Sequence, residues 1–193
     1  MIFSSSGHCA AKGHKNYDPG AVNSAGRLEA QEAIKVRDRV NAILRSKGYN
    51  VLEDNPTESL KEYLARIKPG PASVVVENHF DAASNPAATG CSALVGDDSS
   101  KTSQAFAKEL SAAVGSALGI KVRDGGDGDG ILFEKDSHRG RLGLMREAGT
   151  VCLLEVCFIS NPSDMQKYDD PAKFEAMCQG IATVIGKYED LIK

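Results

Sequence analysis

Hydrophobic and polar positions divide the chain into two kinds of segment. Short apolar or β-branched runs bounded by Gly, Pro or polar residues are typical of buried strands, whereas apolar residues at helical spacing over a longer stretch are typical of amphipathic helices. The pattern predicts strands over residues 2–5, 49–52, 72–77, 91–95 and 151–156. It predicts helices over residues 28–47, 57–67, 99–118, 141–148 and 171–191.

The order of these elements indicates the fold class. Strands alternate with helices along the whole chain, which is typical of a layered fold in which helices pack against a largely parallel sheet. We therefore predict an α/β fold with a mostly parallel, twisted sheet of about six strands and helices on both faces. A length of 193 residues fits one domain that spans residues 1–193.

Composition narrows the class of partner. Hydrophobic residues make up 41% of the chain and charged residues 25%, which argues against a disordered or fibrous protein. A net charge of −3 provides no basic face, so nucleic acid is not expected as a partner. No apolar run approaches the roughly 20 residues that span a bilayer, so no stable membrane association is expected. The N-terminus has no signal-peptide pattern, so we expect cytoplasmic synthesis, and we expect a monomer.

The five cysteines argue against a disulfide scaffold. Their number is odd and no short paired spacing occurs, which also argues against a Cys-rich zinc site. Cys152 and Cys178 lie in apolar surroundings, so we predict that they are small core residues. Synthesis in a reducing compartment is therefore expected.

Three polar residues lie at the ends of predicted strands. His8 and His79 come at or just after two strands, and Glu155 lies near the end of a third. Because the carboxyl ends of parallel strands share one edge of a sheet, we expect the three side chains to meet there. Glu29 opens the first long helix and can reach the same edge. Two imidazoles and one carboxylate are a common Zn²⁺ ligand set that leaves a position for water.

Each residue also has a plainer interpretation. A single His after a strand is most often a hydrogen-bonded loop residue. Glu29 suits the first turn of any helix, because the helix dipole favours an acid there. Glu155 interrupts an apolar run, where a carboxylate is costly unless it is paired or functional. It is either a buried partner of a residue such as Arg146 or an acid/base that moves a proton from the attacking water to a leaving amine.

Four motifs follow one another along nearly the whole chain. The first comprises Gly7-His8, Asp18-Pro19-Gly20-Ala21 and Leu28-Glu29-Ala30. The others are Gly48-Tyr49-Asn50-Val51, Glu77-Asn78-His79-Phe80-Asp81-Ala82 and Leu153-Leu154-Glu155-Val156-Cys157-Phe158-Ile159-Ser160-Asn161. In this order they resemble the zinc-dependent N-acetylmuramoyl-L-alanine amidase family of the AmiC-like type.

The resemblance implies that His8, Glu29 and His79 bind Zn²⁺ and that Glu155 is the catalytic acid/base. It implies cleavage of the amide between N-acetylmuramic acid and the L-alanine of the stem peptide, so peptidoglycan or a muropeptide is the expected substrate. It also suggests a secondary substrate or oxyanion role for Arg146, with a salt bridge as the alternative. Without a leader or a wall-binding module, the chain fits an endolysin that acts on the wall after release.

The chain departs from the family pattern near the site. The insert over residues 9–17 is longer than usual and carries His14, which is an alternative to His8 as the first ligand. Asp81 stands where the family has Asn, which affects the expected peptide recognition. These departures make the N-terminal loop the least determined part of the predicted site.

Two other features have modest expected roles. His138 is expected to cap or solvate the start of a helix, with a substrate contact as the alternative. The Gly-rich stretch over residues 125–130 lacks the terminal Glu of an EF-hand, so we interpret it as a loop near the cleft rather than a calcium site.

Three rival functions remain from the sequence. A carboxypeptidase could use the same zinc set on free peptides, and a wall-binding protein could keep the fold without activity. A thiol hydrolase would use Cys157 or Cys9, although no Cys-His-Asn arrangement is evident. The products released from muropeptides and the effect of a chelator distinguish these rivals from the amidase.

Overall fold

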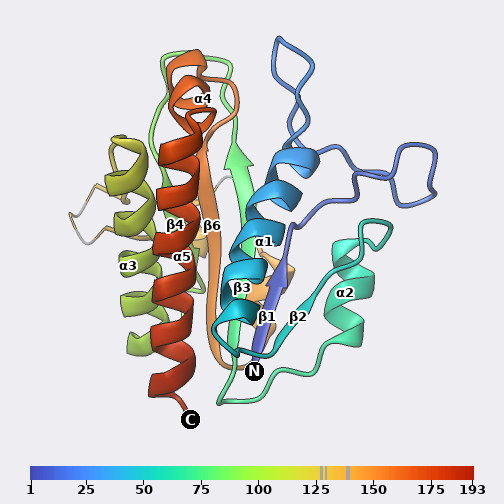
Figure 1. Ribbon diagram of the computed structural model, residues 1–193, viewed down its shortest axis with the longest axis vertical. Coiled ribbons are helices and arrows are strands. Elements are labelled where there is room, and N and C mark those ends of the chain that lie inside the picture. The colour runs from blue at the N-terminus through green and yellow to red at the C-terminus, as the bar shows by residue number, and fades with distance from the viewer. Residues whose placement is uncertain (127, 129, 138–139) are drawn as a thin grey trace.

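The computed structural model in Figure 1 has a β-sheet at its centre. Over the residues that the structure describes, 1–126, 128, 130–137 and 140–193, the sheet has six strands in the order β2-β1-β3-β6-β4-β5. They are β1 (Ile2–Ser5), β2 (Val51–Glu53), β3 (Val74–Asp81), β4 (Ser92–Val95), β5 (Leu132–Phe133) and β6 (Thr150–Phe158). β2, β1, β3 and β6 are parallel to one another. β4 runs antiparallel to β6, and β5 runs parallel to β4. The predicted α/β fold with a mostly parallel sheet is confirmed.

Helices cover both faces of this sheet. One face is covered by three long helices, α1 (Glu29–Ser46), α3 (Lys101–Leu118) and α5 (Pro171–Leu191). The other face is covered by α2 (Leu60–Arg66) and the 3₁₀ segment η2 (Gly143–Arg146). The remaining short elements are η1 (Glu134–Asp136) after β5 and α4 (Pro162–Tyr168) between β6 and α5.

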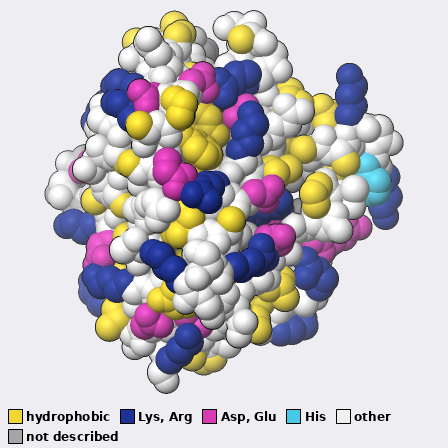
Figure 2. Space-filling model, viewed as in Figure 1, with side chains coloured by type: hydrophobic (Ala, Val, Ile, Leu, Met, Phe, Trp, Pro, Cys, Tyr) yellow, Lys and Arg dark blue, Asp and Glu magenta, His cyan; other side chains and the backbone are white. Residues whose placement is uncertain are grey.

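The face of α1 and α5 is the one presented in Figures 1 and 2. Positive and negative side chains are interspersed on it, with apolar side chains between them (Figure 2). Among the described residues, no helix combines the length and the apolar character that crossing a membrane requires.

Alternation along the strands separates two apolar cores. Val74 and Val76 of β3 point into the larger core under α1, α3 and α5, whereas Val75 points into the smaller core under α2 and η2. In β6, Leu154 belongs to the larger core and Leu153 to the smaller. Because successive side chains of a strand point to opposite faces, polar residues two positions beyond Val75 and Leu153 emerge on the α2 face.

The ends of several helices follow from local chemistry. Ser59 caps α2 by accepting from the Glu62 amide, and the Glu62 carboxylate accepts from the Ser59 amide in return, which forms a capping box. This box starts α2 at Leu60 rather than at residue 57, where the sequence placed it. Asp170 caps α5, and Pro171 at its first position suits a helix start.

The predicted elements are confirmed with several corrections. The predicted helix over 171–191 has the observed bounds, and 28–47 and 99–118 differ from α1 and α3 by one or two residues. The prediction that β3 ends at residue 77 was wrong, because polar residues after it are held by hydrogen bonds and the strand continues to Asp81. Within the helix predicted over 141–148, only Gly143–Arg146 are helical, and they form the 3₁₀ helix η2 rather than an α-helix. β5 and α4 were not predicted, since two and seven residues are too short for a periodic signal.

Candidate metal centre and active site

His8 lies three residues beyond the end of β1. Its Nδ1 lies 2.8 Å from Asp18 Oδ2, and its Nε2 lies 3.1 Å from Glu29 Oε1 without forming an aligned hydrogen bond. Gly7 adopts φ +69°, and a Cβ at this position would come within 2.2 Å of His79 Nε2. The chain can therefore turn from β1 into the site only with glycine before His8.

Glu29 is the first residue of α1 and is almost fully buried. Its Oε2 accepts from the Ala21 amide at 2.8 Å, and its Oε1 accepts from the Phe80 amide at 3.1 Å. A Cβ at Gly20, which has φ +63°, would lie 2.6 Å from Glu29 Oε2. A solvated first-turn acid needs none of these contacts, so the helix dipole alone does not explain Glu29.

His79 lies inside β3 on the α2 face of the sheet. Its Nδ1 lies 2.8 Å from Glu29 Oε1, and its Nε2 lies 2.8 Å from Glu77 Oε1. Ser5 Oγ donates to the other Glu77 oxygen at 3.3 Å, which ties this carboxylate to β1. The ring of His8 stands edge-on to that of His79, with centroids 4.8 Å apart.

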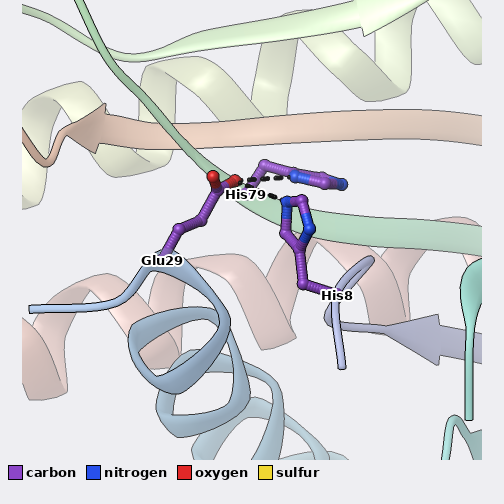
Figure 3. A group of neighbouring side chains, drawn as sticks. All are labelled: His8, Glu29 and His79. Carbon is purple, nitrogen blue, oxygen red and sulfur yellow. Dashed lines mark hydrogen bonds and ion pairs between the residues drawn. The ribbon is translucent and has the colours of Figure 1, made fainter. Parts of the chain in front are cut away.

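These three side chains converge from separate elements onto one point (Figure 3). One donor atom from each of His8, Glu29 and His79 lies within 4.8 Å of the others. The nitrogens nearest Glu29 are His8 Nε2 and His79 Nδ1, and the second nitrogen of each ring is held by Asp18 or Glu77. Carboxylates that orient metal-binding histidines in this way are a usual feature of zinc sites. The donor set and its outer partners therefore fit Zn²⁺.

The charges of His8, Glu29 and His79 depend strongly on one another. Burial lowers the pKa of His79, but its contacts with Glu29 and Glu77 outweigh burial and raise the pKa from 6.5 to about 10. Burial likewise opposes but does not prevent a raised pKa of His8, whose ring is paired with Glu29. Burial raises the pKa of Glu29, and the two histidines lower it well below its ordinary value. Without a metal, His79 therefore retains a proton at neutral pH, and a metal ion must displace it.

Glu155 is next to this group in the sheet. It is the register partner of His79 across the β3–β6 ladder and of Ser92 across the β4–β6 ladder. Only 4% of its surface is exposed, and it is two residues beyond Leu153 on the α2 face. The sequence-predicted proximity of Glu155 and His79 is thus present in the structure.

Two cavities adjoin at this position. The histidine cavity, of about 360 Å³, is lined by His8, Glu77 and His79 together with apolar residues such as Leu60 and Leu153. The acidic cavity, of about 570 Å³, is lined by Glu155 and further acidic residues on the β4–β5 side. Leu153 lines the first and Glu155 the second, so the two cavities follow each other along the same face of β6.

Other predicted residues lie away from the three donors. His14 is exposed and its Nδ1 accepts from the Asn16 amide, so the structure brings His8 rather than His14 to Glu29. Arg146 forms a salt bridge, as the alternative interpretation expected, but its partner is Glu134 and not Glu155. The cavities that Arg146 lines contain neither His79 nor Glu155. A substrate contact for Arg146 stays a prediction, and His138 and parts of the 125–130 stretch lie outside the described residues.

The five cysteines are buried and none is in a disulfide. Burial raises the pKa of the Cys157 thiol well above its ordinary value, which suits a core residue rather than a nucleophile. Cys9 lines the histidine cavity, but its thiol donates to the Pro56 carbonyl. The geometry therefore does not favour a thiol hydrolase.

Four residues that surround the donors were not identified from the sequence as functional. Asp18 and Glu77 orient the histidines, and Gly7 and Gly20 leave room for His79 and Glu29. Gly7, Asp18 and Gly20 belong to motifs noted in the sequence, but no local pattern tells which distant side chain each one contacts. Glu77 opens the motif that contains His79, and it also stands at the end of the predicted apolar strand.

Comparison with known proteins places this geometry in context. Residues 10–187 match a family described as N-acetylmuramoyl-L-alanine amidase, a span that contains Glu29, His79 and Glu155 and begins just after His8. No curated protein matches the chain at the sequence level.

Several solved structures share the fold over nearly its full extent. The catalytic domain of CwlV, an amidase from Bacillus (Paenibacillus) polymyxa var. colistinus, is 22% identical with a TM-score of 0.75 and covers 98% of this chain and 97% of its own. A putative amidase from Neisseria meningitidis is 27% identical with a TM-score of 0.67, and the match covers 96% of this chain and 94% of that protein. The catalytic domain of the CD27L endolysin, which targets Clostridia difficile, is 17% identical with a TM-score of 0.70, and the cover is 96% for both chains.

Proposed function

Because the chain belongs to the N-acetylmuramoyl-L-alanine amidase family, we propose that it cleaves peptidoglycan at a zinc centre formed by His8, Glu29 and His79, with Glu155 as the acid/base. The reaction hydrolyses the amide between N-acetylmuramic acid and the L-alanine of the stem peptide. The observation that carries the zinc proposal is the convergence of two imidazoles and one carboxylate, each imidazole held by a further carboxylate.

The chemistry divides between the metal and the chain. When bound, zinc would supply a Lewis acid that polarises the scissile carbonyl and makes water more acidic. Asp18 and Glu77 keep the donor nitrogens of His8 and His79 aimed at Glu29. The amides of Ala21 and Phe80 hold both oxygens of Glu29 in place. Little rearrangement is then needed when the metal binds.

Glu155 is placed to move the proton. In the proposed reaction its carboxylate accepts a proton from the attacking water while the water oxygen bonds to the lactyl carbonyl carbon. The same proton passes to the nitrogen of L-alanine as the carbon–nitrogen bond breaks, which leaves a lactyl carboxylic acid and a free amine. Its position beside His79 in the sheet, in the lining of the acidic cavity, supports this role.

Two variants test the assignment. We expect Glu155→Gln to retain zinc but to lose turnover by at least ~10²-fold, because general acid/base transfer is removed. We expect His79→Ala to lose zinc itself. Zinc content is measured by atomic emission, and products are measured by mass analysis of digested muropeptides. Full zinc together with full activity in either variant would overturn the assignment.

The same digest separates the rival functions. New L-alanine amino termini identify amidase cleavage, whereas cuts inside the stem peptide would indicate a carboxypeptidase. Chelation should abolish activity and added zinc should restore it. Activity that survives complete zinc removal would contradict the zinc proposal and favour a thiol enzyme.

We also propose that residues 1–193 act as one catalytic domain and that the protein reaches the wall after release from the cell. The family match over 10–187 and the shared sheet support the first point. The likeness to an endolysin catalytic domain supports the second. Cells that produce the protein should lyse only after their membrane is permeabilised, and lysis without permeabilisation would contradict release as the controlling step.

A further inference from the structure

The acidic cavity has no part in the proposed proton transfer except at its Glu155 end. It extends from Glu155 across β4 toward β5, which is the edge strand of the sheet farther from β1 and His8. Leu94 and Leu132 form an apolar part of its wall, and Asp124 and Asp136 lie among its polar lining residues. A cavity that joins the active site and combines these two surfaces calls for a ligand with an apolar chain and a charged end.

Ser92 provides an independent sign of a ligand at this position. Its side chain is fully buried, lines the cavity and is the register partner of Glu155. In the described part of the chain, Ser92 Oγ has no hydrogen-bond partner. A buried hydroxyl without a partner is unfavourable, and a ligand that enters the cavity can satisfy it.

The charged residues that line the cavity indicate the charge of that ligand. Asp124 accepts from the Gly126 amide, and Asp136 accepts from the Phe133 amide. Among the residues that the structure describes, no cationic side chain pairs with either carboxylate. Arg123, a cation that lines the same cavity, is engaged by Asp81 at 2.5 Å and stacks on Phe158. The cavity is therefore favourable for an ammonium group and unfavourable for a carboxylate.

The substrate class contains one group that meets these requirements. The sugars are N-acetylated and uncharged, and the D-glutamyl residue and the peptide end carry carboxylates. The diamino acid at the third position of the stem carries an ammonium group at the end of a methylene chain. We propose that the acidic cavity binds this side chain, with Ser92 Oγ as a hydrogen-bond acceptor and Asp124 and Asp136 as counter-charges. This inference rests on the proposed function.

The dimensions agree with that assignment. Neighbouring strands lie about 4.8 Å apart, so β4 is about 10 Å from β3 and its His79. Two extended residues span about 7 Å, so the third residue of the stem reaches β4 when the scissile amide is at His79. The glycan then lies over the histidine cavity and the peptide over the acidic cavity. Acylation of the amine in a cross-link removes its charge, so uncross-linked stems are the preferred substrates.

The test compares two muropeptides that differ only at the diamino acid. Both are N-acetylmuramoyl tripeptides ending in L-lysine, one with a free ε-amine and one with an N-acetylated ε-amine. We expect the wild-type protein to cleave the free-amine substrate with kcat/KM higher by roughly tenfold, the size expected of partly screened charge pairs. The double variant Asp124→Asn/Asp136→Asn should lose this preference and keep its rate on the acetylated substrate.

Two further variants separate recognition from folding. Ser92→Ala should keep or raise the melting temperature, because it removes a hydroxyl without a partner, and should reduce kcat/KM for the free-amine substrate alone. Asp98→Asn removes the same charge from an exposed acid that lines the neighbouring cavities, and it should change neither substrate. Equal cleavage of both substrates, or an equal loss on both in Ser92→Ala, would overturn the subsite. Failure to release L-alanine termini from either substrate would instead overturn the proposed function.

Discussion

Asp18 and Glu77 show how single side chains prepare the proposed metal centre. Each carboxylate is 2.8 Å from the ring nitrogen that faces away from Glu29, so each sets the orientation of one histidine. Burial raises the pKa of Asp18, but its contact with His8 and the Gly20 amide lowers the pKa below its ordinary value. Both acids are therefore placed to act through the histidines.

Glu77 gives the sharper test of this positioning role. We expect Glu77→Gln to weaken zinc binding by about 10- to 100-fold, the usual effect of outer-shell ligands, because a neutral amide no longer makes the His79 ring more basic. Competition with a chromophoric chelator measures the affinity. Glu53→Gln is the control, because Glu53 binds Asn41 and Arg45 instead. Equal zinc affinities of Glu77→Gln and wild type would rule out the role.

At the scale of elements, the turn after β1 brings its donor within reach of the others only because Gly7 has no side chain. Gly7 and Gly13 both have positive φ, but only at Gly7 would a Cβ meet another group, His79 Nε2, while Gly13 faces open space. Alanine at either position carries a backbone cost of about 1–2 kcal/mol. The difference between the two variants therefore isolates the effect on the site.

We expect Gly7→Ala to displace His79 and to lower activity by about 10²-fold, which a shift of about 1 Å can cause. Gly13→Ala should be less stable but should keep its zinc and its activity. Thermal melts, zinc content and muropeptide cleavage are compared for the two proteins. Matching zinc content and activity in the two variants would show that close packing against His79 has no functional effect.

A buried ion pair joins α1 to the residue that follows β2. Arg37 and Asp54 are 3% and 5% exposed, and their side chains meet at 2.6 Å. Asp54 also accepts from the amide and hydroxyl of Ser6, two residues before His8. The pair therefore fixes the strand end that leads into the site.

Removing the cation should be costly for folding. We expect Arg37→Ala to lower the free energy of unfolding by about 3–5 kcal/mol, because it leaves the Asp54 carboxylate buried without its partner. Arg39→Ala is a matched control on the same helix, because its ion pair with Glu175 is exposed and should contribute less than about 1 kcal/mol. Urea denaturation measures both. Similar losses in the two variants would contradict the importance of the buried pair.

At the scale of the whole molecule, the two faces of the sheet serve different purposes. The larger core lies under α1, α3 and α5, and the side chains of Glu77, His79 and Glu155 lie on the opposite face. Substitutions on the site face can therefore change chemistry while the larger core keeps the fold.

The pH dependence of stability should reverse when zinc binds. In the metal-free protein the raised pKa of His79, about 10 against 6.5 in the unfolded chain, stabilises the fold below pH 6.5, and this contribution declines as the pH rises toward 10. With zinc saturating, folded His79 carries no proton, so stability should instead rise between pH 6 and 7.

Thermal melts from pH 6 to 8, with chelator and with saturating zinc, measure the two slopes. This window lies below the range in which the buried thiols contribute. His79→Ala should flatten the metal-free slope. Identical slopes with and without zinc would contradict a metal at the His8–Glu29–His79 site.

Much of the architecture is contained in local patterns of the sequence. Residues 171–191 follow an Asp-Pro start and keep apolar residues at helical spacing, so both ends of α5 are predictable. β3 was predicted too short because Glu77, Asn78 and His79 look like the end of a strand, and only their pairing with β6 makes them part of it. Local sequence patterns do not predict where a strand ends when its polar residues are paired with residues that are distant in the sequence.

The sequence by itself determined the α/β class, the long helices and the four residues of the proposed site, because periodicity and ordered motifs are local properties. It left His8 and His14 as alternatives, and it left Glu29 open to interpretation as a first-turn acid. The tertiary structure decided that His8 faces Glu29, that Asp18 and Glu77 hold the histidines, and that an acidic cavity adjoins Glu155. His8 meets Asp18 and Glu29 from 10 and 21 positions away, and Glu77 meets His79 because both side chains leave β3 on the same face. Only the folded chain brings these groups within a few ångströms of one another.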